Sequence, residues 1–226
     1  MISSFRSLLA GTLAGAMAAG CGSSGLPPAA TPSRTATAPP PTPGDTAQWA
    51  LVPPGHGTLR QDEIAIKIGV RNAVQARVLP LDESVIRLLA PDSYRALRDL
   101  QAGRREEIAA IARRYNLRQP ALFYVSFYGL EPEARFSPRE LVVTSSGRDV
   151  RPVEIIPLTM GFGEQRIRQR ETQSAIYVFE DGIDVLQPMT VTLEGTANRS
   201  WEATLRVLER ERALVRSRAG GEGGAA

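Results

Sequence analysis

The sequence has very little of several residues on which whole classes of active site depend. Among its 226 residues there is one cysteine, Cys21, one histidine, His56, and one lysine, Lys67. A disulfide needs two cysteines, and the common zinc sites need several Cys or His ligands, so the sequence excludes both. It also has no Gly-rich phosphate loop ending in Gly-Lys and no Gly-x-Gly-x-x-Gly run between a strand and a helix. No cofactor is therefore expected.

The charge is nearly balanced, with 27 Lys and Arg against 24 Asp and Glu and a formal net charge of +3. A dedicated nucleic-acid binder carries a stronger basic excess, so no nucleic-acid partner is expected. The apolar content of 42% is sufficient for a packed core in one large domain or two small ones.

The first 21 residues have the pattern of an export signal. Residues 1–6 carry one positive charge, and residues 7–19 are uncharged and mostly apolar. This apolar run is shorter than the roughly 20 residues that span a bilayer, which favours a signal peptide over a membrane helix. The four residues Ala18-Ala19-Gly20-Cys21 resemble the lipobox of bacterial lipoproteins, with Ala18 where leucine is usual.

That resemblance implies cleavage before Cys21, a diacylglycerol on its thiol and an acyl chain on its new amino group. Two or three acyl chains hold a protein on a membrane far more firmly than one. Gly22, rather than Asp, implies sorting to the outer membrane if the organism is Gram-negative. Two alternatives are an ordinary secretory signal with an incidental cysteine and a cytoplasmic free thiol.

Composition divides the rest of the chain. Residues 22–48 contain seven prolines among small residues, so residues 21–48 are predicted to be a lipidated, disordered tether. Residues 49–215 form the predicted domain, and the Gly-rich residues 216–226 a disordered tail.

Within the domain, short apolar or alternating segments separated by turn residues predict strands. In residues 201–208, for example, Trp201, Ala203, Leu205 and Val207 alternate with polar residues. Turns are expected at Ser146-Gly147 and Asp181-Gly182. The expected strands are residues 63–70, 74–79, 121–128, 140–144, 150–158, 175–180, 189–194 and 201–208.

Residues 92–116 change to a helical period and predict two short helices. Asp92 or Ser93 is the expected cap, Gly103 a left-handed stop, and Pro120 follows the second helix.

Residues 135–143, followed by Gly147, resemble a strand-and-turn pattern of immunoglobulin-like domains in bacterial surface proteins. The resemblance covers about 20 residues and implies architecture only. The predicted fold is therefore mainly β, an immunoglobulin-like antiparallel β-sandwich with a two-helix insertion at about residues 92–116.

Few side chains suggest chemistry. Glu180, Asp181 and Asp184 surround a glycine and are weak candidates for a hard cation such as calcium, although solvated hairpin acids are the favoured interpretation. A serine nucleophile would need His56, whose Pro- and Gly-rich surroundings favour an ordinary loop residue. No catalytic residue is assigned.

Two surfaces are candidates for binding. Arg166, Arg168 and Arg170 alternate with other residues, so an extended chain would project all three from one face toward a polyanion, or protect a strand edge. Tyr124, Tyr128 and Tyr177 are the candidate partner surface. Both faces of their strands are apolar, and the predicted helices or a partner protein would cover the second face.

These features predict a non-enzymatic, lipid-anchored binding or assembly module of the cell envelope, with another envelope protein as partner. The alternatives are an envelope hydrolase or carbohydrate-active enzyme that uses carboxylates, and a polyanion-binding surface domain.

Overall fold

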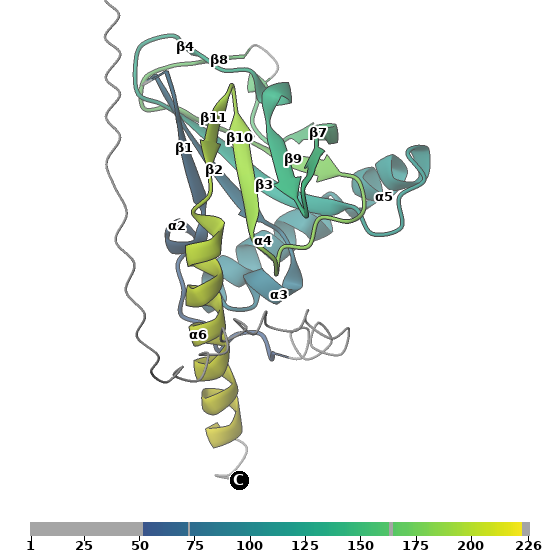
Figure 1. Ribbon diagram of the computed structural model, residues 1–226, viewed down its shortest axis with the longest axis vertical. Coiled ribbons are helices and arrows are strands. Elements are labelled where there is room, and N and C mark those ends of the chain that lie inside the picture. Colours follow the sequence, from purple (N-terminus) through teal and green to yellow (C-terminus); the bar gives the residue numbers. More distant parts are fainter. Residues whose placement is uncertain (1–51, 72, 163–164, 223–226) are drawn as a thin grey trace, which may run out of the picture. The chain divides into compact units, whose positions relative to one another are not determined.

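The computed structural model describes residues 52–71, 73–162 and 165–222. The expected signal peptide, Cys21 and the Pro-rich segment up to residue 48 lie outside these residues. The described part is rich in antiparallel strands, which form two main sheets and one short ribbon, and it also contains several helices (Figure 1).

The larger sheet has five antiparallel strands in the order β1-β2-β3-β9-β7. Apolar side chains on alternate positions of β3, at Phe123, Val125 and Phe127, are fully buried, whereas the intervening side chains are partly exposed. This two-residue period is what the sequence predicts for the strand. The bounds are Ile66–Val70 (β1), Val74–Pro80 (β2), Ala121–Gly129 (β3), Thr172–Phe179 (β9) and Pro152–Pro157 (β7).

The smaller sheet has four antiparallel strands in the order β11-β10-β5-β6. Its β5–β6 turn is the expected Ser146-Gly147 pair, with φ angles of 50° and 76° that suit a tight hairpin. The bounds are Thr196–Asn198 (β11), Met189–Leu193 (β10), Val142–Ser145 (β5) and Arg148–Val150 (β6). A separate ribbon pairs β4 (Ala134–Arg135) with β8 (Arg166–Ile167).

The two main sheets are joined at both pairs of edges and share a core. The chain passes from β6 at Val150 to β7 at Pro152 across one residue. On the other side, the Asn198 side-chain amide donates a hydrogen bond of 2.8 Å to the Lys67 carbonyl of β1. Inside, the fully buried Tyr177 donates its hydroxyl to the Pro138 carbonyl at 2.9 Å. These contacts fasten the sheets around one apolar interior.

Aromatic packing fills this interior at one end. Phe127 of β3 stacks on Phe136 with 4.3 Å between ring centroids, and Phe162 contacts both rings. Leu141 and Val143 are also fully buried.

The expected two-helix insertion is present as α4 (Pro91–Gly103) and α5 (Arg105–Arg114). Its caps differ from the prediction. The position before the first helical residue is Ala90, because Pro91 occupies the first turn, where its missing N–H costs nothing. Gly103 ends α4 without a positive φ, and the left-handed residue is Asn116, at 53°.

The prediction for residues 201–208 is wrong, because they begin the long helix α6 (Trp201–Glu222). The buried side chains follow a helical period, from Trp201 through Leu205 and Leu208 to Val215, whereas Ala203 is exposed. The expected disordered tail is also partly wrong, since residues 216–222 continue α6, while residues 223–226 lie outside the described part.

Other strand boundaries differ from the predictions. Residues 63–70 divide into the end of a short helix, α2 (Gln61–Ile64), and strand β1. A 3-10 helix, η1 (Pro138–Glu140), precedes β5, so the strand expected at residues 140–144 begins at Val142 instead. Residues 150–158 divide at Arg151 between two sheets. One further short helix, α3 (Glu83–Ile86), follows β2.

Candidate functional site

A cleft of about 870 Å³ lies where α3, the first residues of β3 and the loop after β9 meet. Its apolar walls include Leu81 and Val185, both almost fully buried. Charged side chains also line it, and this is where two of the acids singled out by the sequence, Asp181 and Asp184, are found.

The carboxylates of this loop hold the backbone in place. Asp181 accepts hydrogen bonds from the N–H groups of Arg118 and Gln119, each at 2.9 Å. Because those residues follow α5, Asp181 fastens the end of the helical insertion to the end of β9. Asp184 accepts the N–H of Leu186 at 2.9 Å, which stabilises the turn of the same loop.

The third acid, Glu180, lies 3.7 Å from Arg148 in an exposed ion pair. Within the described ranges, no three acidic, histidine or cysteine side chains are grouped so that they could hold a metal ion. Asp181 and Asp184 therefore hold the loop backbone in place, and a cation role for Glu180, Asp181 and Asp184 gains no geometric support.

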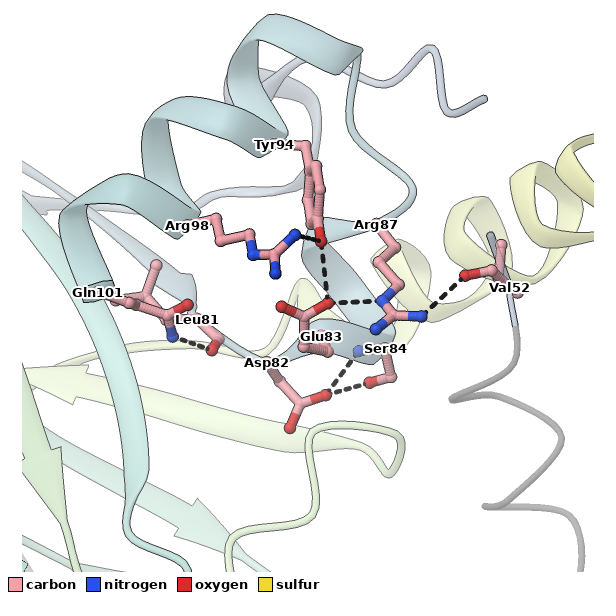
Figure 2. A network of polar contacts seen from close by, with 9 residues as sticks. All are labelled: Val52, Leu81, Asp82, Glu83, Ser84, Arg87, Tyr94, Arg98 and Gln101. Carbon is pink, nitrogen blue, oxygen red and sulfur yellow. Dashed lines mark hydrogen bonds and ion pairs between the residues drawn. The ribbon is translucent and has the colours of Figure 1, made fainter. Parts of the chain in front are cut away.

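A polar network extends from this cleft along α3 (Figure 2). Asp82 accepts the Ser84 N–H at 2.8 Å and the Ser84 hydroxyl at 2.5 Å, so it caps the first turn of α3. The Glu83 carboxylate accepts from Arg87 Nε at 2.5 Å and from the Tyr94 hydroxyl at 3.3 Å. The hydrogen bond that Arg87 donates to Glu83 is the main cause of the raised pKa of the Arg87 guanidinium.

The same network ties distant segments together. Arg87 donates to the Val52 carbonyl at 3.2 Å, and Gln101 of α4 donates to the Leu81 carbonyl at 2.6 Å. Figure 2 shows these bonds on either side of α3. Helix α4 is thus fixed against the end of β2, and the first described residue, Val52, is held beside α3.

A smaller cleft of about 460 Å³ lies between α4, α5 and the start of β3. It shares Glu83, Pro120 and Leu122 with the larger cleft. The helical insertion therefore lies beside the start of β3, at one end of the large sheet, whereas Tyr124 and Tyr128 farther along this strand are partly exposed.

The structure separates the three tyrosines of the expected partner surface. Tyr124 and Tyr128 are partly exposed on one face of β3. Tyr177 of β9 is opposite Phe123, hence on the other face, and is fully buried. The inclusion of Tyr177 in an accessible surface is wrong, because its strand is the fourth of five and its side chain points between the sheets.

The three arginines expected to line one extended face are not all in extended chain. Strand β8 covers only Arg166 and Ile167, and a turn follows in which Arg170 has a φ of 63°. Arg166 and Arg168 flank the buried Ile167 and are exposed. A polyanion role remains a prediction, but Arg170 does not continue the alternation.

Sequence reasoning missed the contact between the start of the domain and α6. Glu211, with its side chain 5% exposed, accepts from the Thr58 N–H at 2.8 Å, the Thr58 hydroxyl at 2.9 Å and Arg218 at 2.8 Å. Arg218 also donates to the His56 carbonyl at 2.7 Å. Glu211 lies on the same side of α6 as the buried Thr204 and Leu208. This helical spacing could have indicated a buried carboxylate, but only if residues 201–222 had been predicted to be a helix.

Comparisons with protein-family models, curated protein sequences and solved structures gave no match to this chain. Of the helices in the described ranges, none is both long and apolar enough to cross a membrane.

Proposed function

We propose that this protein is a lipid-anchored binding or assembly module of the cell envelope. The observation that carries the proposal is the run Ala18-Ala19-Gly20-Cys21 directly after an uncharged apolar segment of signal-peptide length. Acyl chains on Cys21 attach the mature chain to a membrane, and the absence of Asp at position 22 favours the outer membrane of a Gram-negative organism.

The Pro-rich residues up to 48 serve as the tether between that anchor and the domain. A chain of this composition reaches roughly 80 Å in the extended polyproline II form. Such a spacer allows the domain to meet a partner, which we propose to be another envelope protein, away from the anchor point.

The arrangement of the larger cleft supports binding more than catalysis. Its apolar walls are built from buried side chains, and Asp82, Asp181 and Asp184 all accept hydrogen bonds from backbone N–H groups of the protein. A catalytic carboxylate pair instead faces a common bond of the substrate across a cleft. The half-exposed Tyr124 and Tyr128 add a second surface of the amphipathic kind that is enriched in interfaces.

Classification of the domain as an immunoglobulin-like sandwich is part of the same proposal. Two antiparallel sheets and the burial of Phe136, Leu141 and Val143 support it. The larger sheet contains the consecutive neighbours β1-β2-β3 before β9 and β7. An experimental structure compared with known sandwiches would decide whether this strand order belongs to that group.

Metabolic labelling with a palmitate analogue tests the anchor. The wild-type protein should be labelled and should fractionate with membranes, because the acyl chains bury many methylene groups. Cys21→Ser should be unlabelled and should move to the soluble fraction. Ser23→Ala, two residues after the modified position, is the matched control and should remain labelled. An unlabelled wild-type protein, or a Cys21→Ser protein that stays with the membranes, contradicts the proposal.

A further inference from the structure

An arginine patch, defined as Arg135, Arg166 and Arg168, lies on the β4–β8 ribbon. The antiparallel register places Arg135 directly opposite Arg166. Arg168 follows two residues after Arg166, and all three residues are exposed. About 30 residues separate Arg135 from the other two in the sequence, and only the pairing of β4 with β8 brings the three together.

Core packing directs these side chains outward. Ala134 is 5% exposed and Ile167 is 1% exposed, so each strand of the ribbon turns its small or apolar residue toward the interior. Successive side chains of a strand point to opposite faces. The burial of Ala134 and Ile167 therefore places Arg135, Arg166 and Arg168 on the solvent side.

The backbone beneath the patch is held at several points. Phe136 N–H donates to the Gln165 carbonyl at 3.2 Å, and the buried Gln173 side chain donates to the Arg166 carbonyl at 2.9 Å. Gly129 approaches Arg168 so closely that a Cβ at position 129 would lie 2.2 Å from the Arg168 carbonyl oxygen. The ribbon is thus fixed to the large sheet, and the backbone positions of the three arginines are fixed relative to one another.

This arrangement has an electrostatic cost that no ion pair among the described residues offsets, although the Glu171 carboxylate attracts Arg168 at longer range. Like charges placed directly opposite on neighbouring strands destabilise the pair. None of the three guanidinium groups has a carboxylate within 4.0 Å among the described residues. The Glu171 carboxylate accepts the Arg168 backbone N–H at 3.0 Å, the bond that contributes most to lowering its pKa, and it also accepts from Gln173.

We propose that the arginine patch binds the phosphate groups of an anionic lipid surface. Planar guanidinium groups bind phosphate through paired hydrogen bonds, and clustered arginines near a membrane add their attractions to its negative potential. The inference rests on the proposed function, because an anchor at Cys21 keeps the patch at high local concentration beside a membrane.

The length of chain before the domain makes this contact geometrically feasible. Figure 1 shows the β4–β8 ribbon at the end of the sheets away from α6, while Thr58 is bound to α6 through Glu211. A domain of this size has a radius of gyration of about 15 Å. Residues 22–48 can extend to roughly 80 Å, enough for the domain to turn its ribbon toward the membrane that holds its anchor.

Vesicle sedimentation of the unacylated mature chain, residues 21–226 with Cys21→Ser, tests the patch independently of lipidation. The chain should bind vesicles of mixed phosphatidylglycerol and phosphatidylcholine, and binding should weaken with added salt. Replacing all three patch arginines by Gln should lower the partition coefficient about a hundredfold, from about fivefold for each arginine. Vesicles of phosphatidylcholine alone should bind neither protein.

The matched control replaces Arg95, Arg105 and Arg113, exposed residues of α4 and α5, by Gln. It removes the same charge and should retain binding to within a few-fold. Circular dichroism should show both triple variants folded. Because the patch replacement removes like-charge repulsion, its melting temperature should not fall, and a patch variant that unfolds is replaced in the test by the single change Arg135→Gln.

Three outcomes overturn the proposal. The first is equal binding by the patch variant and the unaltered chain, which would leave the arginines only a strand-edge role. The second is an equal loss in the control variant, which would mean an effect of net charge. The third is thermal stabilisation by inorganic phosphate, lost in the patch variant, with no binding to vesicles, which would indicate a site for free phosphate. Failure of palmitate labelling at Cys21 would contradict the anchor alone.

Discussion

The contact between Glu211 and the start of the domain offers the sharpest test of the structure. One oxygen of a carboxylate on α6 accepts three hydrogen bonds, two from Thr58 and one from Arg218. Glu211→Ala removes all three. Hydrogen bonds to a charged group each contribute about 1.5–3 kcal/mol, but these three share one acceptor and are not additive.

The solvent exposure of Arg218 limits the loss of stability expected for Glu211→Ala. The Arg218 side chain is 37% exposed and can be hydrated when its partner is removed, whereas the Glu211 side chain is only 5% exposed. We therefore expect Glu211→Ala to lower the free energy of unfolding by about 3 kcal/mol, near the lower end for breaking a buried charge pair. For a domain of this size, that corresponds to a fall of about 6–12 °C in Tm.

Thermal unfolding followed by circular dichroism measures this effect on the full chain. Glu211→Gln keeps an acceptor oxygen and should lose only about 1 kcal/mol. Glu209→Ala, an exposed site on the same helix, should change the free energy of unfolding by less than about 0.5 kcal/mol. The reasoning is refuted if Glu211→Ala unfolds at the same temperature as Glu209→Ala.

Two further predictions concern the core and a close backbone approach. Burial raises the pKa of Tyr177, so its stabilising effect is complete below pH 10 and is lost as the unfolded chain ionises above it. Between pH 8 and pH 11, the free energy of unfolding measured with urea should therefore fall by about 1.4 kcal/mol more for the wild-type protein than for Tyr177→Phe. An equal fall in both proteins would contradict the burial of the Tyr177 hydroxyl. Gly57→Ala should lower stability by about 1–3 kcal/mol, because its Cβ would lie 2.3 Å from the Leu88 backbone. Gly69→Ala, whose Cβ meets nothing within 4 Å, should be nearly neutral in the same melting assay, and equal effects at both glycines would disprove the contact.

Local patterns allowed much of the large sheet to be predicted. Residues 121–128 are apolar on both faces, which predicts a strand, and β3 is found at Ala121–Gly129 with burial alternating along it. Residues 201–208 alternate between apolar and polar side chains, yet they form a helix. Within eight residues, a strand period of two and a helical period of 3.6 place several of the same positions on one face. Only the buried side chains farther along, up to Val215, distinguish the helix from a strand.

The candidate sites depended on contacts that no local pattern contains. Tyr177 and Tyr124 both belong to apolar strands, and only the pairing register shows that they occupy opposite faces. Asp181 resembles a turn acid in the sequence, yet it binds two backbone amides about 60 residues away. The residues next to Asp181 in the sequence do not distinguish a solvated surface carboxylate from one that binds backbone N–H groups after a distant helix.

The sequence by itself determined the features that depend on neighbouring residues: the signal-like N-terminus before Cys21, the Pro-rich composition of residues 22–48, the antiparallel strands and the helical pair after residue 90. Tertiary structure alone decided which residues meet. It placed Arg135 opposite Arg166, enclosed Tyr177 between two sheets and joined Glu211 to Thr58. Secondary structure follows short-range periodicity and backbone preference, whereas these pairs follow from the way distant strands and helices bury their apolar faces together.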